Sequence, residues 1–166
     1  MSALRRDLTH YSWRAWCSEP AIWAIVHYRL GQSLMSLQGP LGSVLRVLHT
    51  IVGVAVRGIS GIEIPRTAKI GGGLRIAHGR GILLHSGSVI GSDCTLRHGV
   101  TIGVSRNGGD GVPVVGDRVE LGAYAQVLGD IKIGDGAKIG AMAVVLDDVP
   151  AGGVAFAPKA TIRPPR

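Results

Sequence analysis

Aromatic side chains, cysteines and acidic residues are all scarce in this sequence, and each shortage argues against a class of protein. Phe, Trp and Tyr make up 4% of the 166 residues, and no basic run is interleaved with them, so no nucleic-acid-binding surface is expected. Cys17 and Cys94 lie in different segments without a C-x-x-C spacing. We therefore expect free thiols in a reducing compartment rather than a disulfide framework. The shortage of acids leaves a net charge of +7, which indicates a solvated basic surface or one that meets anionic ligands.

Long uninterrupted apolar runs are also missing. Arg5-Arg6 is followed by Asp7 and further polar residues rather than by the apolar centre of a secretory signal. The apolar stretch 41–59 carries Arg46 and Arg57, which makes it a poor membrane-spanning helix, although it could lie in a membrane interface. We therefore expect a cytoplasmic protein, and we add the hypothesis of peripheral contact at the inner membrane face through the N-terminal helices.

Glycine, in contrast, is abundant, and it follows a period of six. The 26 glycines show no strict triplet, which argues against collagen. With two interruptions, an aliphatic residue recurs at every sixth position, often followed by Gly; the series comprises Ile64, Ile70, Ile76, Leu84, Ile90, Leu96, Ile102, Val115, Leu121, Val127, Ile133, Ile139 and Val145. This period fits neither a helix nor one long strand. It predicts a solenoid in which each hexad forms one short strand and one turn.

This aliphatic-Gly hexad resembles the repeat of the hexapeptide acyltransferases over roughly residues 60–160. The resemblance implies a mainly β fold, a left-handed parallel β-helix with three hexads per coil. Residues 61–166 would then form the acyltransferase domain, with a polar, Gly-rich loop at 103–114 and a C-terminal tail that caps the open end or lies over a neighbouring chain.

Residues 1–60 contain no hexads and are expected to form an α-helical N-terminal region. Ser18 and Pro20 mark a helix start, with Ser18 as the N-cap, and Gln38-Gly39-Pro40 marks a stop. Apolar residues from Leu41 to Val56 then follow one helical face. We expect two or three helices, packed on the first coil or on a neighbouring subunit.

Two histidines occupy equivalent places in consecutive repeats. His78 lies two residues after Ile76, and His98 lies two residues after Leu96. A coil of the expected fold has 18 residues, and two extra residues enter near Ile82–Leu84. The separation of 20 residues therefore places both imidazoles at the same corner of adjacent coils. A solvated ladder of polar corner residues is the alternative interpretation.

The segment Ile62–Ile82 is similar to the active-site segment of serine O-acetyltransferases, in which a His acts as general base. The resemblance places that base at His78 and its acidic partner at Glu63, where the family usually has Asp. One 18-residue coil after Glu63 comes Gly81, so we expect Glu63 below the corner of His78, where it would orient the imidazole as a triad carboxylate does. An exposed carboxylate at the end of the coils is the alternative.

The same resemblance implies an acetyl-CoA-dependent O-acetyltransferase that needs no metal. A neutral imidazole takes a proton from the acceptor hydroxyl, and the oxygen attacks the thioester. The donor would lie along the coils near Gly103, Ala123 and Ala141, with Lys138 either at a phosphate or simply solvated. Because active sites of the family lie between neighbouring coils, the resemblance implies a homotrimer, with a dimer of trimers as a variant.

Two departures from the serine enzymes bear on the acceptor. Ala77 stands where they have Asp, and Asp110 is followed by Gly111-Val112-Pro113 where they have Arg-His-Pro. The missing groups are those expected to handle the charges of an amino acid. Residues 96–103 instead resemble the short colanic-acid-type acetyltransferases of exopolysaccharide clusters. We therefore predict transfer to a saccharide or lipid-linked glycan, with His98 as a second catalytic histidine.

Three alternatives from other classes stay open. The first is a serine O-acetyltransferase of cysteine biosynthesis. The second is a metal lyase of the γ-carbonic-anhydrase type, for which His78, His85 and His98 are available, although the usual pair of His five residues apart is missing. The third is a non-catalytic scaffold.

Overall fold

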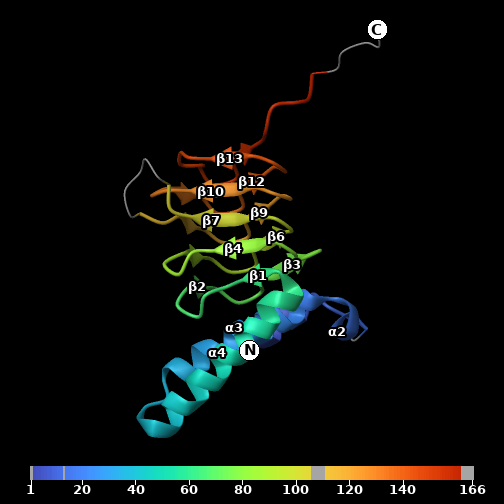
Figure 1. Ribbon diagram of the computed structural model, residues 1–166. Coiled ribbons are helices and arrows are strands. Elements are labelled where there is room, and N and C mark those ends of the chain that lie inside the picture. The colour runs from blue at the N-terminus through green and yellow to red at the C-terminus, as the bar shows by residue number, and fades with distance from the viewer. Residues whose placement is uncertain (1, 13, 106–110, 162–166) are drawn as a thin grey trace.

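Three parallel sheets wind upwards from a helical base in the computed structural model of the protein, which describes residues 2–12, 14–105 and 111–161 (Figure 1). The helices are α1 (Ala3–Leu8), α2 (Ala15–Ser18), α3 (Pro20–Met35) and α4 (Gly39–Ser60). The strands are β1 (Ile62–Glu63), β2 (Lys69–Ile70), β3 (Arg75–Ala77), β4 (Ile82–Leu84), β5 (Val89–Ile90), β6 (Thr95–Arg97), β7 (Thr101–Gly103), β8 (Val114–Val115), β9 (Glu120–Leu121), β10 (Gln126–Leu128), β11 (Lys132–Ile133), β12 (Lys138–Ile139), β13 (Val144–Val145) and β14 (Val154–Ala155). The mainly β solenoid with a short helical N-terminal region is confirmed.

Each turn of the solenoid contributes one strand to each of three sheets. The strand orders are β1-β4-β7-β10-β13, β2-β5-β8-β11 and β3-β6-β9-β12-β14. The aliphatic residues of the hexads point inwards, and Ile76, Leu96, Leu121 and Ile139 are each no more than 2% exposed. Because each coil stacks only on its neighbouring coils, the repeat in the sequence is also the repeat of the core.

The register of the sheets locates the two extra residues of the first coil. Ala77 pairs with Arg97, an offset of 20, whereas Leu84 pairs with Ile102, an offset of 18. The additional residues therefore lie in the segment 78–81 between β3 and β4, slightly before the predicted position. This segment carries His78, so the insertion reshapes the corner at which the site is expected.

The helical region differs from the prediction at its first cap. Glu19, not Ser18, is the N-cap residue of α3, and Pro20 occupies the first turn. The Ser18 hydroxyl instead donates to the backbone carbonyl of Arg14, the N-cap residue of α2. The next helix, α4, ends at Ser60 with Gly61 in the left-handed conformation at φ 63°, where glycine is favoured.

A buried ion pair attaches the helices to the first coil. Asp7 of α1 is fully buried and accepts hydrogen bonds from Arg29 of α3 and from the backbone N–H groups of Gly73 and Leu74. Arg29 also donates to the carbonyls of Ile70 and Gly71. Helices and coil are thus joined through buried charged and polar groups, and leaving these without partners would destabilise the fold.

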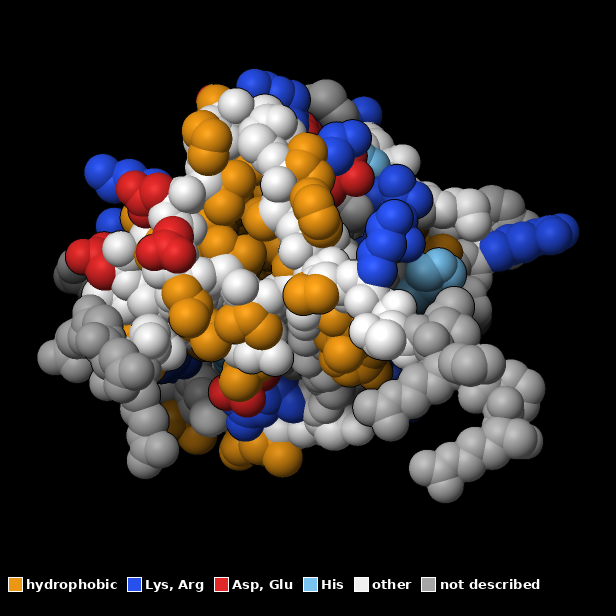
Figure 2. Space-filling view, turned by 90° about the horizontal axis from the view of Figure 1, so that it is seen from above, with side chains coloured by type: hydrophobic (Ala, Val, Ile, Leu, Met, Phe, Trp, Pro, Cys, Tyr) orange, Lys and Arg blue, Asp and Glu red, His pale blue; other side chains and the backbone are white. Residues whose placement is uncertain are grey.

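The far end of the solenoid remains open within the described chain. Viewed from that end, hydrophobic side chains lie at the centre and charged ones at the rim (Figure 2). Val154 and Phe156 are 63% and 78% exposed. The described tail leaves the last coil instead of closing it (Figure 1), so a cap over the coil is not formed by residues up to 161.

Several sequence predictions fall partly outside the described residues. The centre of the loop at 103–114, including Asp110, lies outside them, as do the tail residues 162–166 and the side chain of Cys17. Cys94 is a buried free thiol, and burial raises its pKa.

Candidate active site

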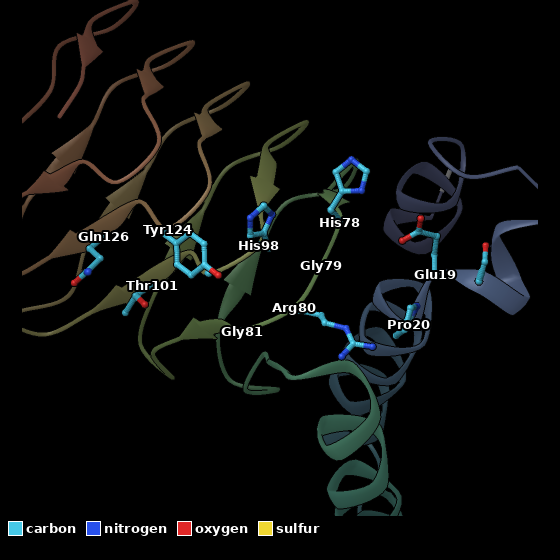
Figure 3. Close-up of a pocket in the computed structure, with 12 residues that line it drawn as sticks. Glu19, Pro20, His78, Gly79, Arg80, Gly81, His98, Thr101, Tyr124 and Gln126 are labelled. Carbon is cyan, nitrogen blue, oxygen red and sulfur yellow. The ribbon is translucent and has the colours of Figure 1, made fainter. Parts of the chain in front are cut away.

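A cleft of about 740 Å³ lies between the start of α3 and one corner of the first coils (Figure 3). Its walls include two histidines, one glutamate, one arginine and one tyrosine. The lining residues are Ser18, Glu19, Pro20, His78, Gly79, Arg80, Gly81, His98, Gly99, Thr101, Tyr124 and Gln126. The cleft therefore concentrates titratable and hydrogen-bonding groups at one place on the surface.

His78 and His98 meet in this cleft, as the spacing predicted. They directly follow Ala77 and Arg97, which are paired in the sheet of β3 and β6. His78 has a left-handed backbone at φ 55°, and Tyr124 has the same geometry at φ 58°. Other corner residues share this backbone, so the turn of the solenoid, rather than the chemistry, imposes it.

His98 is held edge-on against the ring of Tyr124, with 5.2 Å between the ring centroids and an interplanar angle of 90°. Its Nδ1 is buried and has no hydrogen-bond partner among the described residues. A buried ring nitrogen without a partner is costly, and a hydrogen bond from a bound molecule would remove that cost. Tyr124 belongs to the next coil and is 54% exposed, so its ring also offers a surface to a ligand.

Glu19 and Arg80 supply opposite charges to the same cleft, and neither was predicted as a site residue. Glu19 enters from the N-terminus of α3, and Arg80 comes from the lengthened segment after β3 (Figure 3). Glu19 lies outside the hexads, so the repeat gives no information about its position. Arg80 reaches the cleft only because two extra residues lengthen the segment after β3. The only sequence signal near Glu19 is the run Ser18-Glu19-Pro20, which indicates a helix start and no functional site.

Glu63 does not line the cleft of His78. It pairs with Leu83 across β1 and β4, not with Gly81, because this coil has 20 residues rather than 18. The register predicted for Glu63 was therefore wrong. Its exposed side chain lies in a separate groove of about 430 Å³, together with His85 and Gly103. The role of Glu63 as partner of the base stays a prediction.

The residues expected to hold the donor lie on different parts of the solenoid. Gly103 borders the groove of Glu63, where a Cβ at Gly103 would meet nothing closer than a Leu128 side-chain carbon at 3.9 Å, so the groove has room beside the backbone. Ala123 and Ala141 lie at the corner of Tyr124, in consecutive coils. Lys138 lies on another face and forms an exposed ion pair with Glu120 at 3.4 Å, which fits the solvated alternative.

The three histidines considered for zinc are not gathered in one place. His78 and His98 share the cleft, whereas His85 lies in the groove of Glu63 and accepts a hydrogen bond from Gly87 N–H through Nδ1. Over residues 2–12, 14–105 and 111–161, no group of three His, Cys, Asp or Glu residues could hold a metal ion.

Comparisons with known proteins agree with this geometry. A family model described as bacterial transferase hexapeptide (six repeats) matches residues 113–147. The serine acetyltransferase of Helicobacter pylori is 42% identical over 149 residues, which cover 89% of this chain and 84% of that protein. The putative colanic acid biosynthesis acetyltransferase WcaB of Escherichia coli is 44% identical over 75 residues, which cover 44% of this chain and 45% of that protein.

A solved serine acetyltransferase in complex with CoA has the same architecture. It superimposes with a TM-score of 0.74 and 30% identity over 93% of this chain. The match covers 66% of that longer chain. The similarity therefore includes the coils and most of the helical region described above.

Proposed function

Because the chain belongs to the serine acetyltransferase family of hexapeptide-repeat transferases, and is thus an acetyltransferase that uses acetyl-CoA, we propose that its acceptor is the hydroxyl of L-serine. The observation that carries this proposal is the pair of opposite charges beside His78. Glu19 and Arg80 line the same cleft as the imidazole. A free amino acid carries an ammonium and a carboxylate, and these two side chains match both.

This acceptor was the alternative to the saccharide predicted from the sequence. That prediction rested on the loss of an Asp before the base and of Arg and His in the loop. We propose that Glu19 from the helices and Arg80 from the insertion take over the role of these charges, and their presence in the lining of the same cleft supports this. The similarity to the Helicobacter pylori enzyme, over 89% of this chain, supports serine better than the shorter match to WcaB supports a saccharide.

The proposed chemistry begins at His78. Its neutral imidazole removes the proton from the serine hydroxyl while the oxygen attacks the thioester carbonyl. When the tetrahedral intermediate collapses, the C–S bond breaks and the imidazolium returns the proton to the departing thiolate of CoA. We assign to His98 a hydrogen bond to the acceptor, and its unpartnered Nδ1 at the same cleft supports this role. The groove beside Gly103 would take the pantetheine arm.

Thiol release from acetyl-CoA, measured with purified protein and L-serine, tests this proposal. We expect serine-dependent release that falls by about 10²–10⁴-fold in His78→Ala, because that is the usual contribution of a general base. Calorimetric binding of CoA by the variant provides the control, since the loss should lie in the chemical step. No release with serine, at concentrations where CoA binds, would overturn the serine assignment.

A saccharide acceptor remains the second candidate because of Tyr124. The cleft is much larger than serine requires, and the half-exposed ring of Tyr124 could pack against the apolar face of a sugar. The resemblance to WcaB points the same way. Release with oligosaccharides but not with serine, lost in Tyr124→Ala, would favour this candidate.

A further inference from the structure

The outer face of α4 is apolar and exposed to solvent. Leu41, Leu48, Ile51 and Ile59 are 52–70% exposed, and only 11% of the most apolar 18-residue window of this helix is buried. Figure 1 shows the hairpin of α3 and α4 extending away from the coils, with α4 uncovered along its outer side. A contiguous apolar face of this kind marks an interaction surface.

Two common explanations for a long apolar helix, a buried core helix and a leader segment, do not apply to α4. A core helix of a soluble domain would be mostly buried, and this one is not. A leader segment would precede the folded chain, whereas α4 follows α1 and α3, which are fixed to the first coil by Asp7 and Arg29. The exposed face is therefore a feature of the folded protein.

The charges around α4 are of one sign. The sequence contains no Asp or Glu between Glu19 and Glu63. Asp7 neutralises Arg29, but the side chains of Arg57 and Arg66 form no hydrogen bond or ion pair with any described residue. Arg57 is exposed, and Arg66 is half-buried at the base of the hairpin. This part of the surface consequently has unneutralised positive charge.

The positive charge lies along one edge of the apolar face. At about 100° per residue, Arg46, Thr50 and Arg57 fall on the flank of α4 beside the apolar arc. Two adjoining hollows follow this flank, one of about 400 Å³ and one of about 290 Å³, and both are lined by Thr50 and Arg66. Guanidinium and hydroxyl groups thus border the apolar surface, as in helices that lie in a lipid interface.

We propose that α4 lies flat in an anionic membrane surface, with its apolar face among the acyl chains and with Arg57 and Arg66 on lipid phosphates. A spanning orientation is disfavoured, because Arg46, His49 and Arg57 would enter the hydrocarbon. A second copy of the hairpin is a poorer occupant, because it would bring the same uncompensated cations into contact. An anionic lipid surface instead neutralises them.

Flotation of the purified full-length protein with vesicles tests the proposal. Vesicles of equal parts phosphatidylglycerol and phosphatidylcholine are compared with pure phosphatidylcholine. We expect binding to the mixed vesicles, and a drop of about fivefold for Arg57→Gln, because each cation near an anionic surface contributes a factor of that order. Raising the salt concentration should weaken binding in the same direction.

The apolar contribution is tested with Leu48→Gln/Ile51→Gln, for which we expect a loss of about tenfold or more. Leu146→Gln is the matched control, because Leu146 is 54% exposed and Leu48 is 52% exposed, but Leu146 lies at the far end of the solenoid. Equal melting temperatures would show that the variants fold. Binding that is unaffected by the double substitution would overturn the proposal.

Light scattering of the same proteins tests the alternative that a second copy of this chain packs against the apolar face of α4. One result would show that the face is an interface between copies of this chain and that the membrane proposal is wrong. In that case wild-type protein does not bind the mixed vesicles, and the Leu48→Gln/Ile51→Gln variant is less oligomeric than wild type. Because the readout is lipid binding without substrate, failure here would leave the proposed acetyl transfer untouched.

Discussion

At the scale of single residues, the cleft depends on a small difference in loop length. The segment between β3 and β4 has two residues more than its counterpart in the next coil. His78 directly follows β3, before the two extra residues, so it keeps its place at the corner of His98. Arg80 lies within the lengthened part of the segment. Gly79 remains buried in this segment, and a Cβ there would lie 2.4 Å from a methyl carbon of Ile76. The lengthened loop is thus packed in one position and can hold a functional side chain.

Glu19→Gln should weaken the binding of serine selectively. The proposed role of Glu19 is to bind the ammonium group, and a hydrogen bond to a charged group contributes about 1.5–3 kcal/mol. We expect the KM for L-serine to rise by about 10–100-fold, with the KM for acetyl-CoA unchanged, in steady-state thiol-release assays. Glu120→Gln, on the surface of β9, is the matched control and should behave as wild type. Equal KM values for serine in both variants would contradict the role of Glu19.

At the scale of elements, the helices are placed by a few polar contacts rather than by a repeat. Asp7 joins α1, α3 and the loop before β3 within one hydrogen-bonded group. Tyr28 of α3 adds a further link, since its hydroxyl donates to the Ala68 carbonyl at 2.8 Å. These contacts hold the middle of α3 against the first coil, and the helix in turn carries Glu19 at its N-terminal end.

Asp7→Asn should strongly destabilise the fold. It leaves the buried charge of Arg29 without its partner, a change that costs about 3–5 kcal/mol. Asp93→Asn is the natural control, because Asp93 and Arg6 form an ion pair of the same 2.7 Å length whose side chains are 49% and 41% exposed. Exposed pairs contribute about 0–1 kcal/mol. Denaturant unfolding would compare the two, and equal losses would argue against the role given to the buried pair.

The contact between α3 and α4 should weaken in acid. His27 stacks on His49 at 3.7 Å, and burial, together with His49 and Arg57, lowers the pKa of His27 below its ordinary value of 6.5. Arg66 of the first coil borders the same hollow, which has no acidic side chain in its lining. Folding therefore favours the neutral ring.

This stability is present above pH 6.5 and is lost as the pH falls through the lowered pKa of folded His27. Melting temperatures of wild type should thus decrease between pH 7.5 and 5.5 more steeply than those of His27→Gln. Parallel curves for the two proteins would contradict the prediction.

At the scale of the whole molecule, the groove proposed for the acetyl donor lies exposed along one sheet of the single chain. Glu63, Leu83 and Gly103 border that groove, and Leu83 is 48% exposed. A neighbouring chain packed along this sheet would complete it, as expected from the family resemblance. We therefore keep the homotrimer as a prediction, with the dimer of trimers as its larger form.

Light scattering should give a mass of about three times the 17.3 kDa chain, or a multiple of that value. Leu83→Arg should shift the mass towards the monomer, because it introduces an unpaired charge at the proposed contact. It should also weaken CoA binding. A monomeric wild type that binds CoA fully would show that the groove needs no second chain.

The sequence by itself determined the solenoid and the placement of His78 and His98 at the same corner of adjacent coils. Both follow from contacts between consecutive coils, so a fixed period in the chain becomes a fixed distance in space. The same arithmetic misplaced Glu63, because it assumed 18 residues in a coil that has 20. Two additional residues are enough to change the partner across the sheet.

Only the tertiary structure decided which charges face His78 and which face of α4 stays bare. Glu19 reaches the cleft because the buried contacts of Asp7, Arg29 and Tyr28 set α3 against the first coil. The apolar face of α4 was readable as a helical stripe, but its exposure depends on how α3 covers the opposite side. Such contacts join segments far apart in the sequence and follow no period, so no local pattern in the sequence records them.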